Sequence, residues 1–114
     1  MALLSECYRV LRPGGTLRIS TPNLEKVLDD YHLGRTPEWR DAGYRADVPC
    51  QMLNGGMRLF GHQFIYDARE LKRVLDAAGF RNVVRVGWHE SATPALSNLE
   101  TRPFRDDLIF EAVK

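Results

Sequence analysis

The chain has 114 residues, of which 44% are hydrophobic and 27% charged, so it is sized for one soluble globular domain. Its 16 basic and 15 acidic residues leave a formal charge of +1, which offers no general attraction for nucleic acid or an anionic membrane. No apolar stretch reaches the roughly 18 to 20 residues of a membrane span, and Glu6 interrupts the apolar start. We therefore expect a cytoplasmic protein in which Cys7 and Cys50 are free thiols.

The first third of the chain predicts a helix, a strand and a second helix. Apolar residues recur at three- and four-residue spacing over residues 2–11, and Arg12-Pro13-Gly14-Gly15 ends that helix. Thr16–Thr21 alternates apolar and polar side chains and predicts a strand. Thr21-Pro22 then reads as a helix cap followed by proline at the first helical position, with the helix running to Gly34. The residues expected on the buried sides of the two helices are Leu3, Leu4, Cys7, Val10 and Leu11, and Leu24, Val27, Leu28 and Tyr31.

The middle of the chain, about residues 35–63, loses regular periodicity. Pro37, Gly43, Pro49 and Asn54-Gly55-Gly56 interrupt any long helix, while apolar residues still recur as anchors. We predict an ordered insertion with short helical turns. Its apolar anchors are Trp39, Tyr44, Met52, Met57, Leu59 and Phe60.

The last third predicts one helix and two strands. Asp67-Ala68-Arg69-Glu70 has the form of a capping box, and the apolar spacing that follows predicts a helix that ends at Gly79. Residues 82–88 are rich in β-branched and aromatic side chains and predict a strand. Residues 91–106 are loop-like, and residues 107–114 alternate as a final strand.

Two stretches of the chain resemble the later half of class I S-adenosylmethionine-dependent methyltransferases. The join Arg9-Val10-Leu11-Arg12-Pro13-Gly14-Gly15 is similar to the turn that leads into that family's fifth strand, and Ala78-Gly79-Phe80 to the turn before its sixth. Gly61–Asp67, Glu90-Ser91 and the terminal residues 111–114 resemble a bacterial subgroup associated with polysaccharide and cell-surface synthesis. With these stretches the resemblance covers nearly the whole chain.

The resemblance implies an α/β fold with part of a Rossmann-like methyltransferase sheet. In the family's strand order, 3-2-1-4-5-7-6, this chain would supply the equivalents of strands 5, 6 and 7 with flanking helices. Residues 1–114 would form a single truncated domain with an insertion at about 35–63. The family's early E/D-x-G-x-G-x-G cofactor loop has no counterpart, because only Gly14-Gly15 and Gly55-Gly56 are paired and neither has a third glycine at the required spacing. S-adenosylmethionine is thus the cofactor implied by the family, while its binding half is absent here.

The missing half would leave the strand at residues 16–21 without its neighbour, the fourth strand of the family. An unpaired strand edge exposes backbone N–H and C=O groups and invites another chain. We expect either a homodimer that pairs two such edges about a two-fold axis, or a complex with a chain that carries the missing half. No nucleic-acid or membrane partner is expected.

Five polar residues near the family-like motifs are candidates for a site. His62 and Tyr66 are candidate catalytic groups, because either could take a proton from a hydroxyl or amine that attacks a methyl sulfonium. His89, Glu90 and Ser91 are candidate substrate-binding residues. The structural alternative is that His62 caps a turn and that Glu90-Ser91 satisfies a loop.

Other chemistries find less support in the sequence. Cys50, His62 and His89 are not arranged as C-x-x-C or H-x-x-x-H, so we expect no metal site. Ser20-Thr21-Pro22 reads as a helix cap, whereas a serine nucleophile needs a glycine-flanked turn between strand and helix.

Two functions remain open at this stage. The first is the acceptor-side half of a methyltransferase that acts on an oxygen or nitrogen of a saccharide-related or other small molecule, inactive until a partner supplies the S-adenosylmethionine site. The second is a non-catalytic homo-oligomeric binding or assembly module derived from the same fold.

Overall fold

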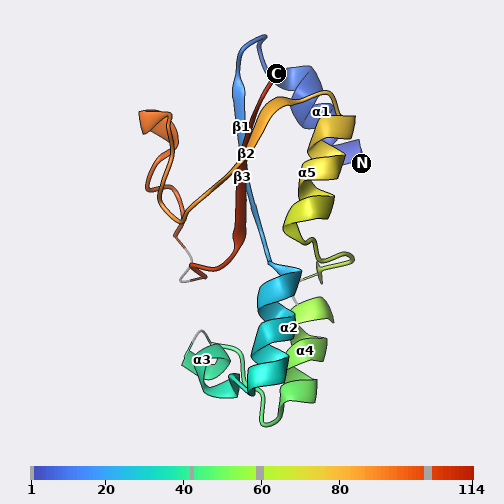
Figure 1. Ribbon diagram of the computed structural model, residues 1–114, viewed down its shortest axis with the longest axis vertical. Coiled ribbons are helices and arrows are strands. Elements are labelled where there is room, and N and C mark those ends of the chain that lie inside the picture. The colour runs from blue at the N-terminus through green and yellow to red at the C-terminus, as the bar shows by residue number, and fades with distance from the viewer. Residues whose placement is uncertain (1, 42, 59–60, 102–103) are drawn as a thin grey trace.

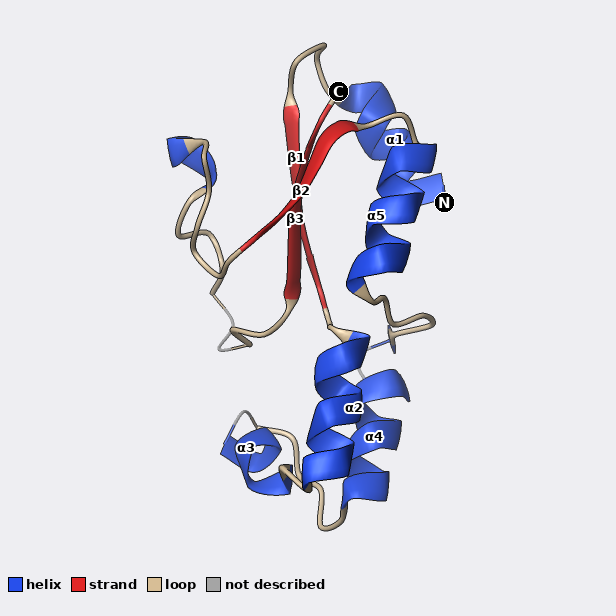
Figure 2. Ribbon diagram, viewed as in Figure 1, coloured by secondary structure: helices blue, strands red, loops and turns tan. Residues whose placement is uncertain are grey.

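A three-stranded sheet with two helices on one face forms one end of the molecule, and a group of helices forms the other (Figures 1 and 2). The computed structural model describes residues 2–41, 43–58, 61–101 and 104–114, over extents of 48 × 27 × 20 Å. The elements are α1 (Ala2–Val10), β1 (Thr16–Thr21), α2 (Leu24–Leu33), α3 (Thr36–Asp41), α4 (Pro49–Arg58), α5 (Ala68–Ala77), β2 (Arg81–Val86), the 3-10 helix η2 (Pro94–Leu96) and β3 (Leu108–Val113).

The last strand in the sequence is the middle strand of the sheet. The strand order is β1-β3-β2, and β3 runs antiparallel to both neighbours, so β1 and β2 run parallel to each other. Thr16 pairs with Val113 and the register continues without a break to Thr21 and Leu108. Both β1 and β3 were predicted from alternation alone, and their bounds agree with the sequence to within one residue.

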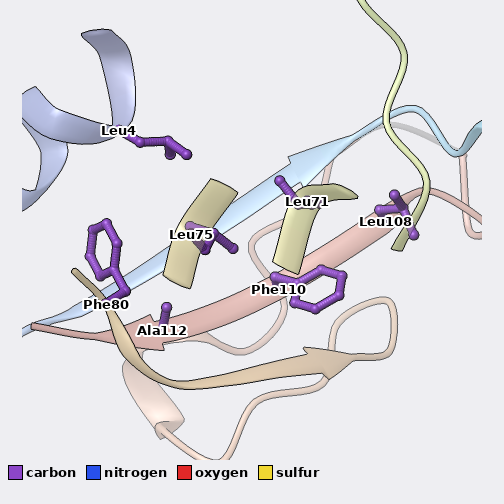
Figure 3. Close-up of a cluster of buried hydrophobic side chains, with 7 residues drawn as sticks. All are labelled: Leu4, Leu71, Leu75, Phe80, Leu108, Phe110 and Ala112. Carbon is purple, nitrogen blue, oxygen red and sulfur yellow. The ribbon is translucent and has the colours of Figure 1, made fainter. Parts of the chain in front are cut away.

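One face of the sheet packs against α1 and α5 to form the hydrophobic core. The central strand β3 supplies alternate residues to this face, and α5 supplies Leu71 and Leu75 at helical spacing. Figure 3 shows these side chains converging with Leu4 of α1. The core cluster consists of Leu4, Leu71, Leu75, Phe80, Leu108, Phe110 and Ala112.

The opposite face of the sheet is also covered. Ile109 and Glu111 of β3 point away from the core, yet both are buried. The described residues of the segment between β2 and β3, 87–101 and 104–107, lie on the side of the sheet away from α5 (Figure 1). A single chain segment without a long helix thus provides the second layer.

Two predicted core positions of α1 are wrong. Leu4 is buried and Cys7 and Leu11 pack against the core, but Leu3 and Val10 are 61% and 66% exposed. The reason is the narrow contact: α1 touches the core along one line, and residues 3 and 10 lie to the side of that line.

The start of α2 also differs from the prediction. Thr21 is the last residue of β1, and the cap is Asn23, whose side chain accepts a hydrogen bond of 3.1 Å from the N–H of Glu25. An asparagine oxygen in this position satisfies a free N–H of the first helical turn, which Thr21 is too far back to reach. The end at Gly34 is confirmed, with a left-handed φ of 64°.

The described part of the insertion is ordered, as predicted, but α4 is a ten-residue helix that runs through Gly55 and Gly56. Aromatic rings occupy the space that a Cβ would need at these two positions of α4, which explains why both residues are glycine. A Cβ on Gly55 would lie 1.7 Å from the Tyr44 hydroxyl, and one on Gly56 would lie 2.7 Å from the Trp39 ring. The expectation that this pair interrupts the helix is therefore wrong. Of the expected anchors, Leu59 and Phe60 lie outside the described residues.

A buried carboxylate ties α2 to the insertion. Asp30 accepts a hydrogen bond of 2.6 Å from the Trp39 indole N–H, and Lys26 bonds its other oxygen at 2.5 Å. Arg35 lies 3.7 Å away and adds positive charge. The predicted burial of Val27 is confirmed, but Leu28 and Tyr31, also predicted on the buried side of α2, are exposed, and Asp30 is buried instead.

The helix α5 begins where the capping box predicts. The Asp67 side chain accepts a hydrogen bond of 2.8 Å from the N–H of Glu70. The Glu70 carboxylate turns outward and accepts bonds of 2.8 and 2.7 Å from Arg73. No helix within the described part of the chain is long and apolar enough to cross a membrane.

Gly55→Ala should destabilise the protein, although glycine to alanine in a helix is ordinarily stabilising by about 1 kcal/mol. We expect a loss of about 1–3 kcal/mol in the free energy of unfolding, because the new methyl group overlaps the Tyr44 ring. Urea denaturation measures this change. Asn54→Ala, at the exposed neighbouring position, is the matched control, and the double variant Gly55→Ala/Tyr44→Ala should recover part of the loss. A stabilised Gly55→Ala would contradict the packing described here.

Candidate functional site

A hollow of about 280 Å³ lies at the carboxyl end of β1, on the face of the sheet covered by residues 87–107. We call it the β1 hollow. Strand β1 contributes two residues with hydroxyl groups, Ser20 and Thr21, and the covering segment contributes aromatic and acidic residues. Its lining residues are Arg18, Ser20, Thr21, Pro22, Trp88, Leu99, Glu100, Thr101, Phe104 and Asp107.

The Arg18 side chain forms the base of the β1 hollow. Its Nε donates to Glu100 at 2.8 Å, and its Nη1 donates to Glu111 at 2.7 Å. Nη1 also donates to the backbone carbonyl of Glu90 at 2.7 Å. The side chains of Arg18 and Glu111 are only 6% and 7% exposed. Since both carboxylates and a carbonyl are satisfied by one guanidinium, the cluster holds the covering segment against the sheet.

The register of the sheet explains half of this cluster. Arg18 and Glu111 are directly opposite each other in the β1–β3 ladder and share the face away from the core. Cross-strand pairs of opposite charge attract at this separation. Glu100 comes from the covering segment and completes the cluster from above.

The charges in the cluster support one another. The hydrogen bond from Arg18 lowers the pKa of Glu100 below its ordinary value of 4.5, and outweighs burial, which acts in the opposite direction. Burial would lower the pKa of Arg18, but hydrogen bonds to Glu100 and Glu111 raise it instead. Glu100 is thus held as a carboxylate, which makes it an anchor and a poor proton acceptor at neutral pH.

His89 is locked into the wall beside the hollow. Its backbone N–H donates to the Glu100 carboxylate at 2.8 Å, and its ring Nε2 lies 2.6 Å from the Glu100 carbonyl oxygen. The ring stacks on Trp88 with centroids 3.3 Å apart, and the Arg105 guanidinium lies 4.8 Å from the Trp88 centroid. The left-handed φ of 62° at His89 turns the chain for these contacts.

The predicted substrate-binding residues come together, and each of them makes hydrogen bonds within the chain. His89, Glu90 and Ser91 are consecutive in the covering segment, and none of them lines the β1 hollow. Glu90 contributes its backbone carbonyl to Arg18, and the Ser91 hydroxyl accepts a bond of 3.0 Å from the N–H of Thr93. These contacts agree with the structural alternative for Glu90-Ser91, in which the two residues satisfy polar groups of a loop.

The two predicted catalytic residues lie elsewhere. His62 and Tyr66 belong to the segment between α4 and α5, on the α5 side of the sheet (Figure 1). The His62 Nδ1 lies 3.3 Å from the carbonyl oxygen of Gly56, at the end of α4. Burial, with a contribution from the charge of Glu70, raises the pKa of Tyr66, so its hydroxyl stays protonated at neutral pH. Neither residue lines the β1 hollow.

Sequence reasoning missed Arg18, Trp88 and Glu100 as site residues. The sequence did contain a signal for Arg18. Arg18 lies in one predicted strand and the oppositely charged Glu111 lies in another, and these two strands pair in the sheet. Glu100 lies in a segment without periodicity, so nothing local marks it.

A second hollow of about 330 Å³ lies on the other side of Trp88, lined by Arg85, Val86, Gly87, Arg105, Asp106 and Asp107. Its two arginines are balanced by two aspartates, so its charge selects no ligand class. The β1 hollow is the stronger candidate because it combines a fixed ion cluster with the Ser20, Thr21 and Thr101 hydroxyls.

The described glycine pairs do not fit an adenosyl cofactor. The Gly14 N–H donates to the Lys114 carbonyl at 2.9 Å, and the Gly15 carbonyl accepts from the Lys114 N–H at 2.9 Å. Gly55 and Gly56 are covered by aromatic rings. Both backbone segments are therefore engaged within the chain, whereas the family's loop must leave its backbone open to the ligand. Likewise, no group of three or more His, Cys, Asp or Glu in the described ranges could hold a metal ion.

Comparison with known proteins identifies no relative. No family model matches the chain, and neither the curated proteins nor the solved structures contain a significant match.

Arg18→Met should destabilise the protein by about 3 kcal/mol or more, because it leaves Glu111 and Glu100 buried without their partner. Arg9→Met is the matched control: it removes an arginine from an exposed pair with Glu6 and should cost less than about 1 kcal/mol. Denaturant unfolding of both variants gives the comparison. Equal losses would show that the cluster does not hold the covering segment.

The Glu100 carboxylate should make stability depend on pH. Because its pKa is lowered by folding, the unfolded chain binds the proton more readily, so the stabilisation is present above the ordinary value of 4.5 and is lost as pH falls through the lower folded value. Wild type should therefore lose more stability between about pH 5 and about pH 3 than Glu100→Gln does. Urea midpoints measured across this range test it, with the exposed Glu6→Gln as control. Parallel curves for wild type and Glu100→Gln would refute the prediction.

Proposed function

We propose that this chain is the acceptor-side part of a class I S-adenosylmethionine-dependent methyltransferase fold. The observation that carries the proposal is the strand order β1-β3-β2, with β3 antiparallel between two parallel strands. The family's order 5-7-6 places its last strand in the same way. The turn at residues 12–15 leads directly into β1, where the family has its fifth strand.

The position of the β1 hollow supports the proposal. Ligands of open α/β sheets bind outside the carboxyl ends of parallel strands. Thr21 ends β1, Val86 ends β2, and Trp88 follows β2 after Gly87, so the hollow lies where the carboxyl ends of both strands meet the covering segment. A bound molecule here would contact Ser20 and Thr21 on one side and Trp88 and Phe104 on the other.

The hollow is suited to hold and orient a polar methyl acceptor. The hydroxyls of Ser20, Thr21 and Thr101 can each donate and accept hydrogen bonds, while Phe104 and Leu99 provide apolar contact. This mixture fits a small molecule with several oxygen or nitrogen atoms, such as a saccharide-related acceptor. In methyl transfer the main contribution of such a site is to hold the acceptor atom in line with the donor methyl group.

The donor site has to come from other polypeptide. Both described glycine pairs are engaged in internal contacts, so neither pair offers a cradle for the cofactor. We therefore expect no catalysis by these 114 residues alone. A donor-bearing polypeptide would complete the sheet beside β1.

Calorimetric titration with S-adenosylmethionine tests the proposal. We expect no binding heat from the chain alone, and binding once a polypeptide that carries a strand, a glycine-rich loop and a helix is added. The candidate for that polypeptide is the product of the adjoining coding sequence. In the mixture, transfer of labelled methyl to small acceptors should fall about tenfold in Thr21→Val, since one acceptor hydrogen bond is lost, while cofactor affinity stays unchanged.

Thr16→Val is the matched control, because it makes the same substitution in the same strand but outside the hollow. Tight binding of S-adenosylmethionine by the chain alone would contradict the proposal. The absence of binding in the mixture would also contradict it, and would leave the assembly-module alternative.

A further inference from the structure

The two outer edges of the sheet are built differently. The edge formed by β2 carries exposed Arg81 and Arg85, and its register with β3 shifts between Arg81 and Val84. Asn82, inside this shift, has a left-handed φ of 50°. Charged side chains and bulges are the devices by which natural sheets keep an edge from pairing with another chain. The β2 edge is therefore protected.

The edge formed by β1 has none of these devices. It is a six-residue strand whose register with β3 has no shift. Its single charged residue, Arg18, is committed to Glu100 and Glu111 within the same chain. No strand in the described ranges pairs with its outer side.

The hydrogen-bond pattern identifies which groups of β1 face outward. The N–H of Lys114 donates to the carbonyl of Gly15, so the Gly15 carbonyl points toward β3. Pairs alternate in an antiparallel ladder, so Leu17, Ile19 and Thr21 also bond to β3. The N–H and C=O groups of Thr16, Arg18 and Ser20 therefore point to the open side. Three consecutive outward residues form a template for a further strand.

We infer that, when no donor-bearing polypeptide occupies it, the β1 edge binds the β1 edge of a second copy in a two-fold antiparallel dimer. The register that uses all outward groups centres on Arg18 and places Thr16 opposite Ser20 of the second copy. Leu17 then lies opposite Ile19 of the second copy, which continues the apolar face of both sheets. The dimer has one continuous sheet of six strands, three from each copy.

Charge favours this edge over the other one. The two copies of Arg18 meet at the two-fold axis, but each is paired with two carboxylates of its own chain, so no unpaired positive charges face each other. Two β2 edges would instead bring exposed Arg81 and Arg85 together with those of the second copy, and like charges on facing strands repel. The inference does not depend on methyl transfer, because it concerns only the backbone and charges of the edge.

Light scattering and amide exchange on the full chain test the inference. We expect a dimer at high concentration, with the amides of Thr16, Arg18 and Ser20 slow to exchange. On dilution these three amides should become fast while those of Leu17, Ile19 and Thr21 stay slow. A monomer at millimolar concentration overturns the inference, and so does a dimer in which the three outward amides remain fast.

Ser20→Pro provides an independent test with a matched control. It removes an outward N–H from each copy without touching the ladder to β3, so the dimer dissociation constant should rise about tenfold or more. Arg85→Pro removes an outward N–H at the β2 edge, because Arg85 pairs with Phe110, whose own bonds face β1. The dissociation constant of Arg85→Pro should stay at the wild-type value, and equal weakening in both variants overturns the inference.

Circular dichroism establishes that each proline variant is folded. If Ser20→Pro does not fold, the amide-exchange measurement on the wild-type chain decides the matter alone. The outcome is separate from cofactor binding, because the dimer can form whether or not S-adenosylmethionine binds to any mixture.

Discussion

The structure depends on the burial of β3 on both faces and its pairing along both edges. Toward α5 the strand presents Leu108, Phe110 and Ala112 to the core, and on the other face Glu111 is paired with Arg18. A carboxylate in this position would be costly without its partner, so the burial of β3 requires the guanidinium of β1. The pairing of β3 with β1 and the neutralisation of the Glu111 carboxylate by Arg18 are thus one constraint.

That constraint also shapes the candidate site. Arg18 reaches beyond β3 to Glu100 and to the carbonyl of Glu90, and in this way holds the segment 87–107 over the sheet. The β1 hollow lies between that segment and the end of β1. Because Glu100 and Glu111 pair with this guanidinium, which is the one charged group of β1, the outer edge of the strand carries no unpaired charge that would discourage pairing. The contacts of Arg18 therefore account for both the β1 hollow and the open edge of β1.

Local pattern was enough to predict most elements, because alternation and helical spacing depend on residues close in sequence. The strands β1 and β3, the α5 cap at Asp67 and the αL end at Gly34 follow from such signals. The prediction failed where distant groups decide. The glycines of α4 read as helix breakers until Tyr44 and Trp39 are seen to fill the space beside them, and Leu3 and Val10 looked buried until α1 was placed.

By itself, the sequence determined the mixed α/β class, the order of its elements and the alternation that gives each strand two different faces. Only the tertiary structure decided that the last strand lies in the middle, that Arg18 meets Glu111 and Glu100, and that His62 and Tyr66 lie away from the hollow. The physical reason is separation along the chain: Arg18 is 93 residues from Glu111 and 82 from Glu100. Contacts over such distances arise from the packing of whole elements, which no local pattern encodes.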